Sequence, residues 1–166
     1  MTPFGATVDG RWPAFIWFEE FMIRQDPKLY NDLMNGKAKY TDPGVQQVFA
    51  KWKEWIDKGY FTDPSISFGT AGTNSMAAEF AQGKLGMILV GTWYVSTLTG
   101  AGLSADDIGA FIMPNEKPEM QPAVIVESGP LLVAEKSSQK ADALKVADYW
   151  MSAPAQQAWV DAQDFP

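Results

Sequence analysis

The chain contains neither cysteine nor histidine. Their absence excludes disulfide bonds, thiol chemistry, zinc sites built from cysteine and histidine, and every catalytic triad that depends on an imidazole. From the sequence we assign no catalytic residue, no metal ion and no cofactor to the chain. A chain without cysteine is compatible with an oxidising and with a reducing compartment, so this criterion leaves its location open.

Basic residues are scarce as well. The chain has 13 lysines and arginines against 20 aspartates and glutamates, which gives a net charge of −7. No cluster of lysine and arginine is longer than a pair. This balance argues against nucleic acid and against an anionic membrane surface as partners.

Long apolar runs are also missing. No run approaches the roughly 18 residues that a membrane-spanning helix needs. Residues 1–5 show neither the basic start nor the apolar core of a signal peptide. We expect a soluble chain, and if the native protein is exported, its targeting segment has been removed or lies upstream of Met1.

Apolar and aromatic residues, in contrast, are abundant. The 166 residues are 46% apolar, which is enough for one packed domain. Seven tryptophans, ten phenylalanines and five tyrosines exceed what a small core usually needs. The extra aromatic surface either enlarges the core or serves recognition.

The spacing of apolar residues predicts several helices. Residues 14–24 form the first, with Pro13 in its first turn and Trp12 at its entry. A second helix over residues 45–58 ends at Gly59. Shorter helices are expected at 75–82 and 94–98, and two more, the first capped by Ser137 or Ser138, at about 139–150 and 153–163. The expected inward residues of the first two helices are Phe15, Ile16, Phe18, Phe21, Met22, Val45, Val48, Phe49, Trp52, Trp55 and Ile56. Trp150 and Trp159 are assigned to packing as well.

Apolar runs of strand length alternate with these helices, which predicts an α/β fold. We expect strands at Leu85–Val90, Ile108–Met113, Ala123–Val126 and Leu131–Ala134, and a strand-like start at residues 2–8. Residues 115–122 contain three charges and two prolines and are predicted to form an exposed connector.

The most informative segment is residues 80–94, which reads FAQGKLGMILVGTWY. Gly83 ends a short helix, and Leu85–Val90 follows as a buried strand. Gly91 then allows a sharp turn before Trp93. Ligands of open α/β sheets sit at the carboxyl ends of the strands, and Trp93 stands at such an end.

Three fragments resemble the extracellular sugar-binding proteins of ABC importers, the family that includes the maltose-binding protein. In residues 80–93, GK-x-x-M is followed by G-x-W. Residues 128–137, SGPLLVAEKS, are similar to the family's turn, strand and helix start. Residues 143–157, ALKVADYWMSAPAQQ, are similar to a late helix and the start of its neighbour. The order and spacing of the fragments carry the resemblance.

The resemblance implies a periplasmic-binding-protein-like architecture. The family has two α/β lobes, each a sheet flanked by helices, and holds its ligand in the cleft between them. Residues 1–112 match the second lobe, and residues 113–122 match the connector that crosses to the first lobe. Residues 123–166 match a segment that packs on the first lobe. We interpret the chain as an internal fragment with an incomplete two-lobe architecture.

The resemblance also implies that Trp93 is a stacking platform for a sugar. An indole offers a flat apolar face and an N–H donor; the alternative is a core tryptophan above the sheet. Gly91 belongs to the same predicted site. Trp12 either lines the cleft or staples the helix entry. Arg11 either binds hydroxyls or a carboxylate, or is a solvated surface charge. Tyr94 either donates its phenol to the ligand or packs inward.

Glu127, Ser128 and Gly129 occupy a turn that, by the resemblance, approaches the ligand from the first lobe. Glycine lets backbone amides come close to a sugar, and a carboxylate accepts hydrogen bonds from two hydroxyls. A simple hairpin turn explains the same residues.

The resemblance therefore predicts an oligosaccharide-binding receptor that works by stacking and hydrogen bonding, with lobe closure as its signal. It implies an oligosaccharide ligand, a membrane permease as partner of the intact parent, and an extracytoplasmic location, in the periplasm or as a membrane-anchored lipoprotein. Two alternatives stay open: a glycoside-processing enzyme that uses two carboxylates, and an acidic protein-interaction module. Glu19 and Glu20 point in different directions on a helix, and Glu79 and Glu127 have no partner that the sequence can place, which favours binding over catalysis.

One consequence concerns the fragment itself. An amphipathic helix at 141–150 exposes its apolar face if its sheet is absent, and such faces tend to find a partner. We expect the chain to associate with itself or to adopt a compact, rearranged packing.

Overall fold

The computed structural model describes residues 1–69, 74–127 and 129–162. The chain divides into two compact units, Met1–Ile125 and Val126–Pro166, called here the first and the second unit. None of the helices formed by the described residues has the length and apolar character needed to cross a membrane.

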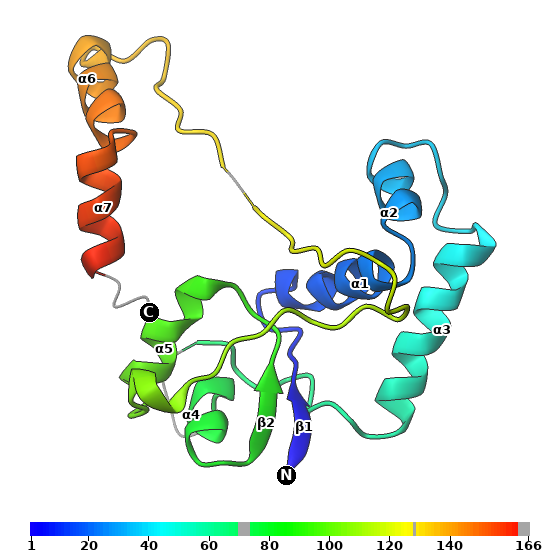
Figure 1. Cartoon of the computed structure of the whole chain (residues 1–166). Coiled ribbons are helices and arrows are strands. Elements are labelled where there is room, and N and C mark those ends of the chain that lie inside the picture. Colours follow the sequence, from blue (N-terminus) through cyan, green and yellow to red (C-terminus); the bar gives the residue numbers. More distant parts are fainter. Residues whose placement is uncertain (70–73, 128, 163–166) are drawn as a thin grey trace. The chain divides into compact units, whose positions relative to one another are not determined.

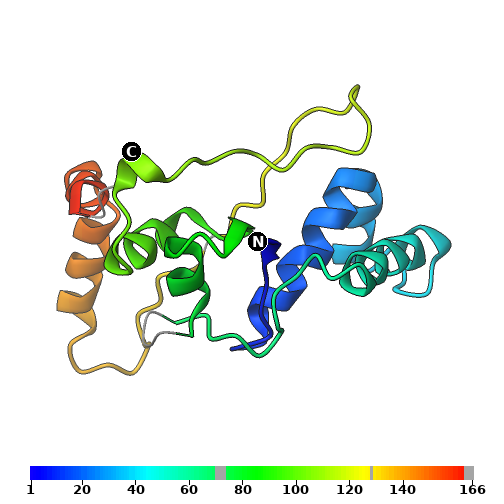
Figure 2. The same cartoon turned by 90° about the horizontal axis from the view of Figure 1, so that it is seen from below.

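Three helices with a proline in their first turn begin the first unit. They are α1 (Trp12–Gln25), α2 (Pro27–Met34) and α3 (Pro43–Asp57), and they lie together in Figures 1 and 2. The predicted helices α1 and α3 are confirmed, and Gly59, with φ of 69°, follows the end of α3 as expected. Helix α2 was not predicted, because Asp26-Pro27 is typical of a helix end; here Asp26 also accepts a hydrogen bond from Leu29 N and starts the next helix.

The first hydrophobic core lies between these helices. Its buried residues are Trp17, Phe18, Phe21, Met22, Leu33, Val45 and Val48, and Phe4, Trp52 and Trp55 pack against them. The expectation that Phe15 is buried is wrong: it lies in the first turn of α1 and is 44% exposed. Phe49 and Ile56 on α3 are 37% and 54% exposed, so they too are less buried than their spacing suggests. The spacing of apolar residues shows which face of a helix is apolar. A residue on that face is buried only if another part of the chain packs against that turn of the helix.

A sheet of two parallel strands, β1 (Thr2–Gly5) and β2 (Leu85–Ile88), lies beside the first core (Figure 1). The register pairs Thr2 with Leu85 and Gly5 with Ile88. Both strands were expected, although each is shorter than the apolar run that predicts it.

Short helices follow around β2. Helix α4 (Met76–Ala81) is capped by Ser75, whose side chain accepts a hydrogen bond from Ala78 N. After β2 come a 3₁₀ turn, η1 (Thr92–Tyr94), helix α5 (Val95–Gly100) and a second turn, η2 (Ala105–Asp107). The second core joins them and consists of Ile66, Met76, Ala77, Leu85, Tyr94 and Leu98. The two predicted short helices are confirmed. The strand between them is less buried than expected, because Leu85 is buried whereas Gly86 and Met87 are exposed.

The prediction of the other strands is wrong. Residues 108–113, 123–126 and 131–134 have no strand assignment, and the sheet of the described residues contains only β1 and β2. A strand is stable only when a neighbour accepts and donates its backbone hydrogen bonds. Apolar content alone therefore overestimated the sheet, and the α/β class holds in the form of a helix-rich fold with a small parallel sheet.

The second unit contains two consecutive helices, α6 (Lys140–Trp150) and α7 (Ala153–Ala162), drawn in orange and red in Figure 1. Both helices were predicted, but Gln139 rather than a serine occupies the N-cap of α6, and its side chain makes no capping bond. The rings of Trp150 and Trp159 pack on each other at 5.4 Å between centroids. Their predicted role in packing is thus met by this ring contact, although the two side chains remain 42% and 50% exposed.

Candidate ligand-binding site

Four aromatic rings from three segments of the first unit meet beside the carboxyl end of β2. This aromatic cluster consists of Trp12 at the start of α1, Phe68 from the long loop after α3, and Trp93 and Tyr94 from η1. Ring centroids of Trp12 and Trp93 are 5.7 Å apart, and Phe68 lies 4.9 Å from Trp12 and 5.7 Å from Trp93. The structure thus brings together Trp12 and Trp93, which the sequence analysis had proposed separately.

Trp93 rests directly on Gly91. A Cβ atom added to Gly91 would overlap Nε1 of Trp93 and would lie 2.8 Å from its Cδ1, which is closer than Cβ atoms come to such neighbours in proteins. The φ of Gly91 is −76°, an angle that any residue adopts. Glycine is therefore required here for the close approach of the indole and not, as expected, for an unusual turn.

The loop before α1 has an unusual backbone. Gly10 and Arg11 both have a positive φ, of 70° and 67°. The ψ of Arg11 is −42°, so this residue lies outside the ordinary allowed regions. A residue with a side chain stores strain there, of order 1 kcal/mol. The turn directs Trp12 back over Gly10, whose added Cβ would lie 3.4 Å from the indole. Arg11 itself is exposed, so its guanidinium faces solvent.

Polar side chains fasten this loop to the loop that carries Phe68. Asp9 Oδ2 accepts hydrogen bonds from Phe68 N at 2.9 Å and from Ser67 Oγ at 3.4 Å. Thr7, which is buried, donates to Ile66 O at 2.5 Å and accepts from Asp9 N at 2.9 Å. These bonds set the distance between Trp12 and Phe68, although the two residues lie far apart in the sequence.

Tyr94 is the buried member of the aromatic cluster. It is 1% exposed, and its hydroxyl donates a hydrogen bond to Phe68 O at 3.1 Å. Burial raises the pKa of Tyr94 to about 12, so the phenol stays protonated and remains a donor. Of the two roles considered for Tyr94, the structure shows the inward-packed one.

The remaining rings reach the surface. Trp93 is 45% exposed, and Trp12 and Phe68 are half-buried. Such a platform offers apolar ring faces, and its indole N–H groups are potential donors. Asp9 and Arg11 at the rim are both exposed and add a carboxylate and a guanidinium. The arrangement suits a ligand that combines apolar faces with hydroxyl groups.

Three predicted site residues belong to the second unit. Glu127 and Gly129 are exposed and lie in irregular chain, and Ser128 lies outside the described residues. The predicted hairpin around them is absent from the described residues, because neither flanking segment forms a strand. Their approach to a ligand stays a prediction.

Asp9 and Phe68 were not identified from the sequence. The sequence did contain a signal for Asp9, because the pair Asp9-Gly10 lies between a strand and the start of a helix. Such a pair is typical of a turn, and it places a carboxylate next to the beginning of the helix. Phe68 stands between Ser67 and Gly69 in a loop without helical or strand period. An aromatic residue in such a loop is unlike a core residue, but only the fold shows which partner it meets.

Two comparisons with known proteins found a match. The family model described as bacterial extracellular solute-binding protein matches residues 5–166. The glucose-binding protein GlcS of Saccharolobus solfataricus is 26% identical over 167 residues, which cover 91% of this chain and 28% of that protein. The chain thus spans less than a third of the length of this relative. No solved structure matches the chain.

Proposed function

Because the chain belongs to the bacterial extracellular solute-binding proteins, we propose that it binds a saccharide on the three rings of the aromatic cluster that reach the surface, Trp12, Phe68 and Trp93. The observation that supports this most is the exposed indole of Trp93, held by its contact with Gly91 beside two further rings. The C–H face of a pyranose ring is apolar and stacks on such a platform. The binding involves no chemical step.

The polar groups at the rim supply selectivity. Asp9 uses Oδ2 to hold the Phe68 loop, and a carboxylate can accept further bonds from sugar hydroxyls. Arg11 offers planar donors from the strained turn beside Trp12. Glu127, Ser128 and Gly129 contribute contacts from the opposite side of an interlobe cleft in the intact protein.

The relative named for glucose binding makes a sugar the proposed solute. In the intact protein this chain is part of the receptor of an ABC importer, located outside the cytoplasm, which delivers an oligosaccharide or a monosaccharide to a membrane permease. One lobe alone binds more weakly than two, because the second wall of a cleft adds buried area and excludes water.

Saturation-transfer NMR tests the proposal because it detects weak binding. Glucose or maltose is added to the chain, and the transfer of magnetic saturation from the protein to the protons of the sugar is measured. We expect transfer with the unmodified chain and with Trp159→Ala, a control that removes an equally exposed tryptophan from the second unit. Trp93→Ala should lower transfer about tenfold, the effect of losing ~1.4 kcal/mol, and Trp93→Phe should restore part of it. Absence of transfer in the unmodified chain, or equal transfer in Trp93→Ala, contradicts the proposal.

The enzymatic alternative, which pairs two carboxylates, loses Glu20 as a candidate. Glu20 is buried and bound to Arg24, so it is committed to an ion pair. A carboxylate that acts on a glycosidic bond must reach the substrate. Incubation with maltose and larger oligosaccharides, followed by an assay of reducing ends, separates the two functions, since a receptor leaves their number unchanged.

A further inference from the structure

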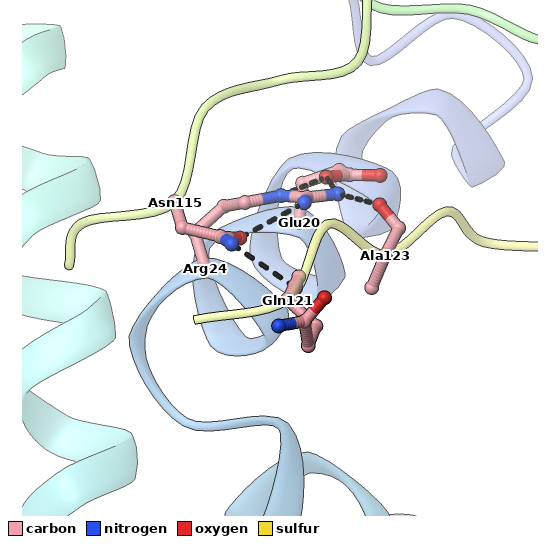
Figure 3. A network of polar contacts seen from close by, with 5 residues as sticks. All are labelled: Glu20, Arg24, Asn115, Gln121 and Ala123. Atoms are coloured by element: carbon pink, nitrogen blue, oxygen red, sulfur yellow. Dashed lines mark hydrogen bonds and ion pairs between the residues drawn. The ribbon is translucent and has the colours of Figure 1, made fainter. Parts of the chain in front are cut away.

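The last turn of α1 holds the connector that leaves the first unit. Arg24 has only 2% of its side chain exposed, and its partner Glu20 has 9%. The Nε and Nη2 atoms of Arg24 donate to Glu20 Oε2 at 2.9 Å and 2.7 Å. This ion pair consumes only part of the guanidinium, and the remaining donors point to the connector (Figure 3).

The remaining donors of Arg24 form hydrogen bonds with both ends of one loop. Arg24 Nη1 donates to Asn115 Oδ1 at 3.1 Å, and Nη2 donates to Ala123 O at 2.6 Å. Asn115 Nδ2 in turn donates to the carbonyl oxygens of Met120 and Gln121, at 2.9 Å and 3.1 Å. The loop 115–123 is therefore closed on itself by Asn115 and fastened to α1 by Arg24 (Figure 3).

Two further contacts support the same attachment. Glu116 N donates to Arg24 O at 3.2 Å, and the Glu116 carboxylate forms an ion pair with Lys51 on α3. The boundary between the units follows shortly after this loop, between Ile125 and Val126.

We propose that the Glu20–Arg24–Asn115 network is a clamp that holds residues 115–123 rigidly on α1. The chain therefore becomes free to bend only after Ala123. The physical reason is the burial of the guanidinium. Releasing the loop leaves Arg24 with donors that have lost their acceptors in a buried place, which is costly. The sequence indicated only an exposed connector at these residues, because its polar composition is that of a solvated loop.

Spin labelling tests the clamp directly, because the chain has no cysteine and each introduced cysteine is unique. Labels are placed at Glu119→Cys within the loop and at Glu127→Cys after it; both positions are exposed. In the otherwise unmodified chain we expect restricted backbone motion for the label at 119 and a mobile spectrum at 127. A mobile label at 119, or equal spectra at both positions, overturns the proposal.

Three backgrounds show whether the network causes the restriction. Asn115→Ala leaves the ion pair intact but removes the closure of the loop, and we expect a mobile component at 119. Glu20→Met combined with Arg24→Met removes the grip while keeping the site filled by apolar side chains of similar length, which buried ion pairs often tolerate; the restricted component at 119 should be lost. Lys51→Ala, which breaks only the partly exposed ion pair with Glu116, should leave most of the restricted component. Circular dichroism identifies variants that fail to fold. An unchanged spectrum at 119 in folded Asn115→Ala and in the folded double variant contradicts the role of the clamp.

Discussion

The two units of this chain differ in what their helices pack against. In the first unit, α1, α2 and α3 enclose one core and β2, α4 and α5 enclose another, so that residues such as Phe21 and Met76 are 1% exposed. In the second unit, Leu131, Leu132, Val146 and Trp150 line an open apolar groove with Val133, Ala143 and Ala147. Leu132 is 79% exposed and Val146 is 68% exposed.

Similar sequence patterns thus lead to different burial. Helix α6 has apolar positions at helical spacing, as α3 has, yet α6 contains no buried residue whereas Val45 and Val48 of α3 are fully buried. An amphipathic helix is stabilised mainly by the surface that it covers, and it needs a partner for that. The first unit provides such partners, while the described part of the second unit leaves one face of α6 uncovered.

The largest expected effect separates the two units by stability. Phe21→Ala in the first core should lower the free energy of unfolding by about 3–5 kcal/mol, since it removes a buried ring and leaves a cavity. Trp159→Ala, which removes an even larger ring that is 50% exposed, should cost much less. Urea titrations followed by circular dichroism measure both. Equal losses would show that the tryptophan pair of the second unit belongs to a core of its own.

A smaller effect is expected from Gly91→Ala at the aromatic cluster. The new Cβ would overlap the indole of Trp93, so the ring must move, at a cost of about 1–3 kcal/mol. Near-ultraviolet circular dichroism should change, because the packing of Trp93 against Trp12 and Phe68 is altered. Gly100→Ala is the matched control, since a Cβ there meets no atom within 4 Å. An unchanged spectrum for Gly91→Ala would contradict the close contact.

The buried phenol of Tyr94 predicts a pH dependence of the first unit. Its pKa of about 12 in the folded chain lies above the ordinary 10.0, so between pH 10 and 12 the unfolded chain loses the proton first. Stability contributed by this group is complete below pH 10 and falls as the pH rises, by at most about 1.4 kcal/mol per pH unit. Urea midpoints measured from pH 9 to 11 should fall more steeply for the unmodified chain than for Tyr94→Phe. Parallel curves would contradict the burial of this group.

The smallest effect on stability is expected on the open groove of the second unit. Leu132→Asp replaces an exposed side chain and should change the free energy of unfolding by no more than about 0.5 kcal/mol. The same substitution should weaken the expected self-association, because it places a charge on the apolar surface. Sedimentation velocity over a concentration series measures this, with Ile56→Asp on the 54% exposed position of α3 as control. A chain that stays monomeric at all concentrations would show that the groove does not cause association.

The sequence predicted local features of the fold well. Pro13 in the first turn of α1, and Gly59 and Gly83 with positive φ, mark helix boundaries through interactions within a few residues. The strands predicted at 108–113, 123–126 and 131–134 were overestimated for the opposite reason, since strand formation depends on a distant partner. The burial of Phe15 was overestimated because helical spacing does not show whether another part of the chain covers the first turn of the helix.

The candidate site follows the same division. Trp93 after a strand and a glycine, and Trp12 at a helix entry, are visible as local patterns. Their meeting with Phe68 is not visible in this way, because it depends on the bond that Thr7 donates to Ile66 O and the bond that Asp9 accepts from Phe68 N. The clamp of Arg24 on Asn115 and Ala123 joins residues still farther apart.

By itself, then, the sequence determined the chemistry that is excluded, the position of most helices, the start of a strand at Leu85, and the resemblance to solute-binding proteins. All of these depend on composition or on contacts between residues close in the chain. Only the tertiary structure decided which aromatic rings share one platform, why Gly91 must be a glycine, and that Arg24 is buried in a network. These features depend on contacts between distant segments, and such contacts form only when the packing of the whole unit brings the segments together.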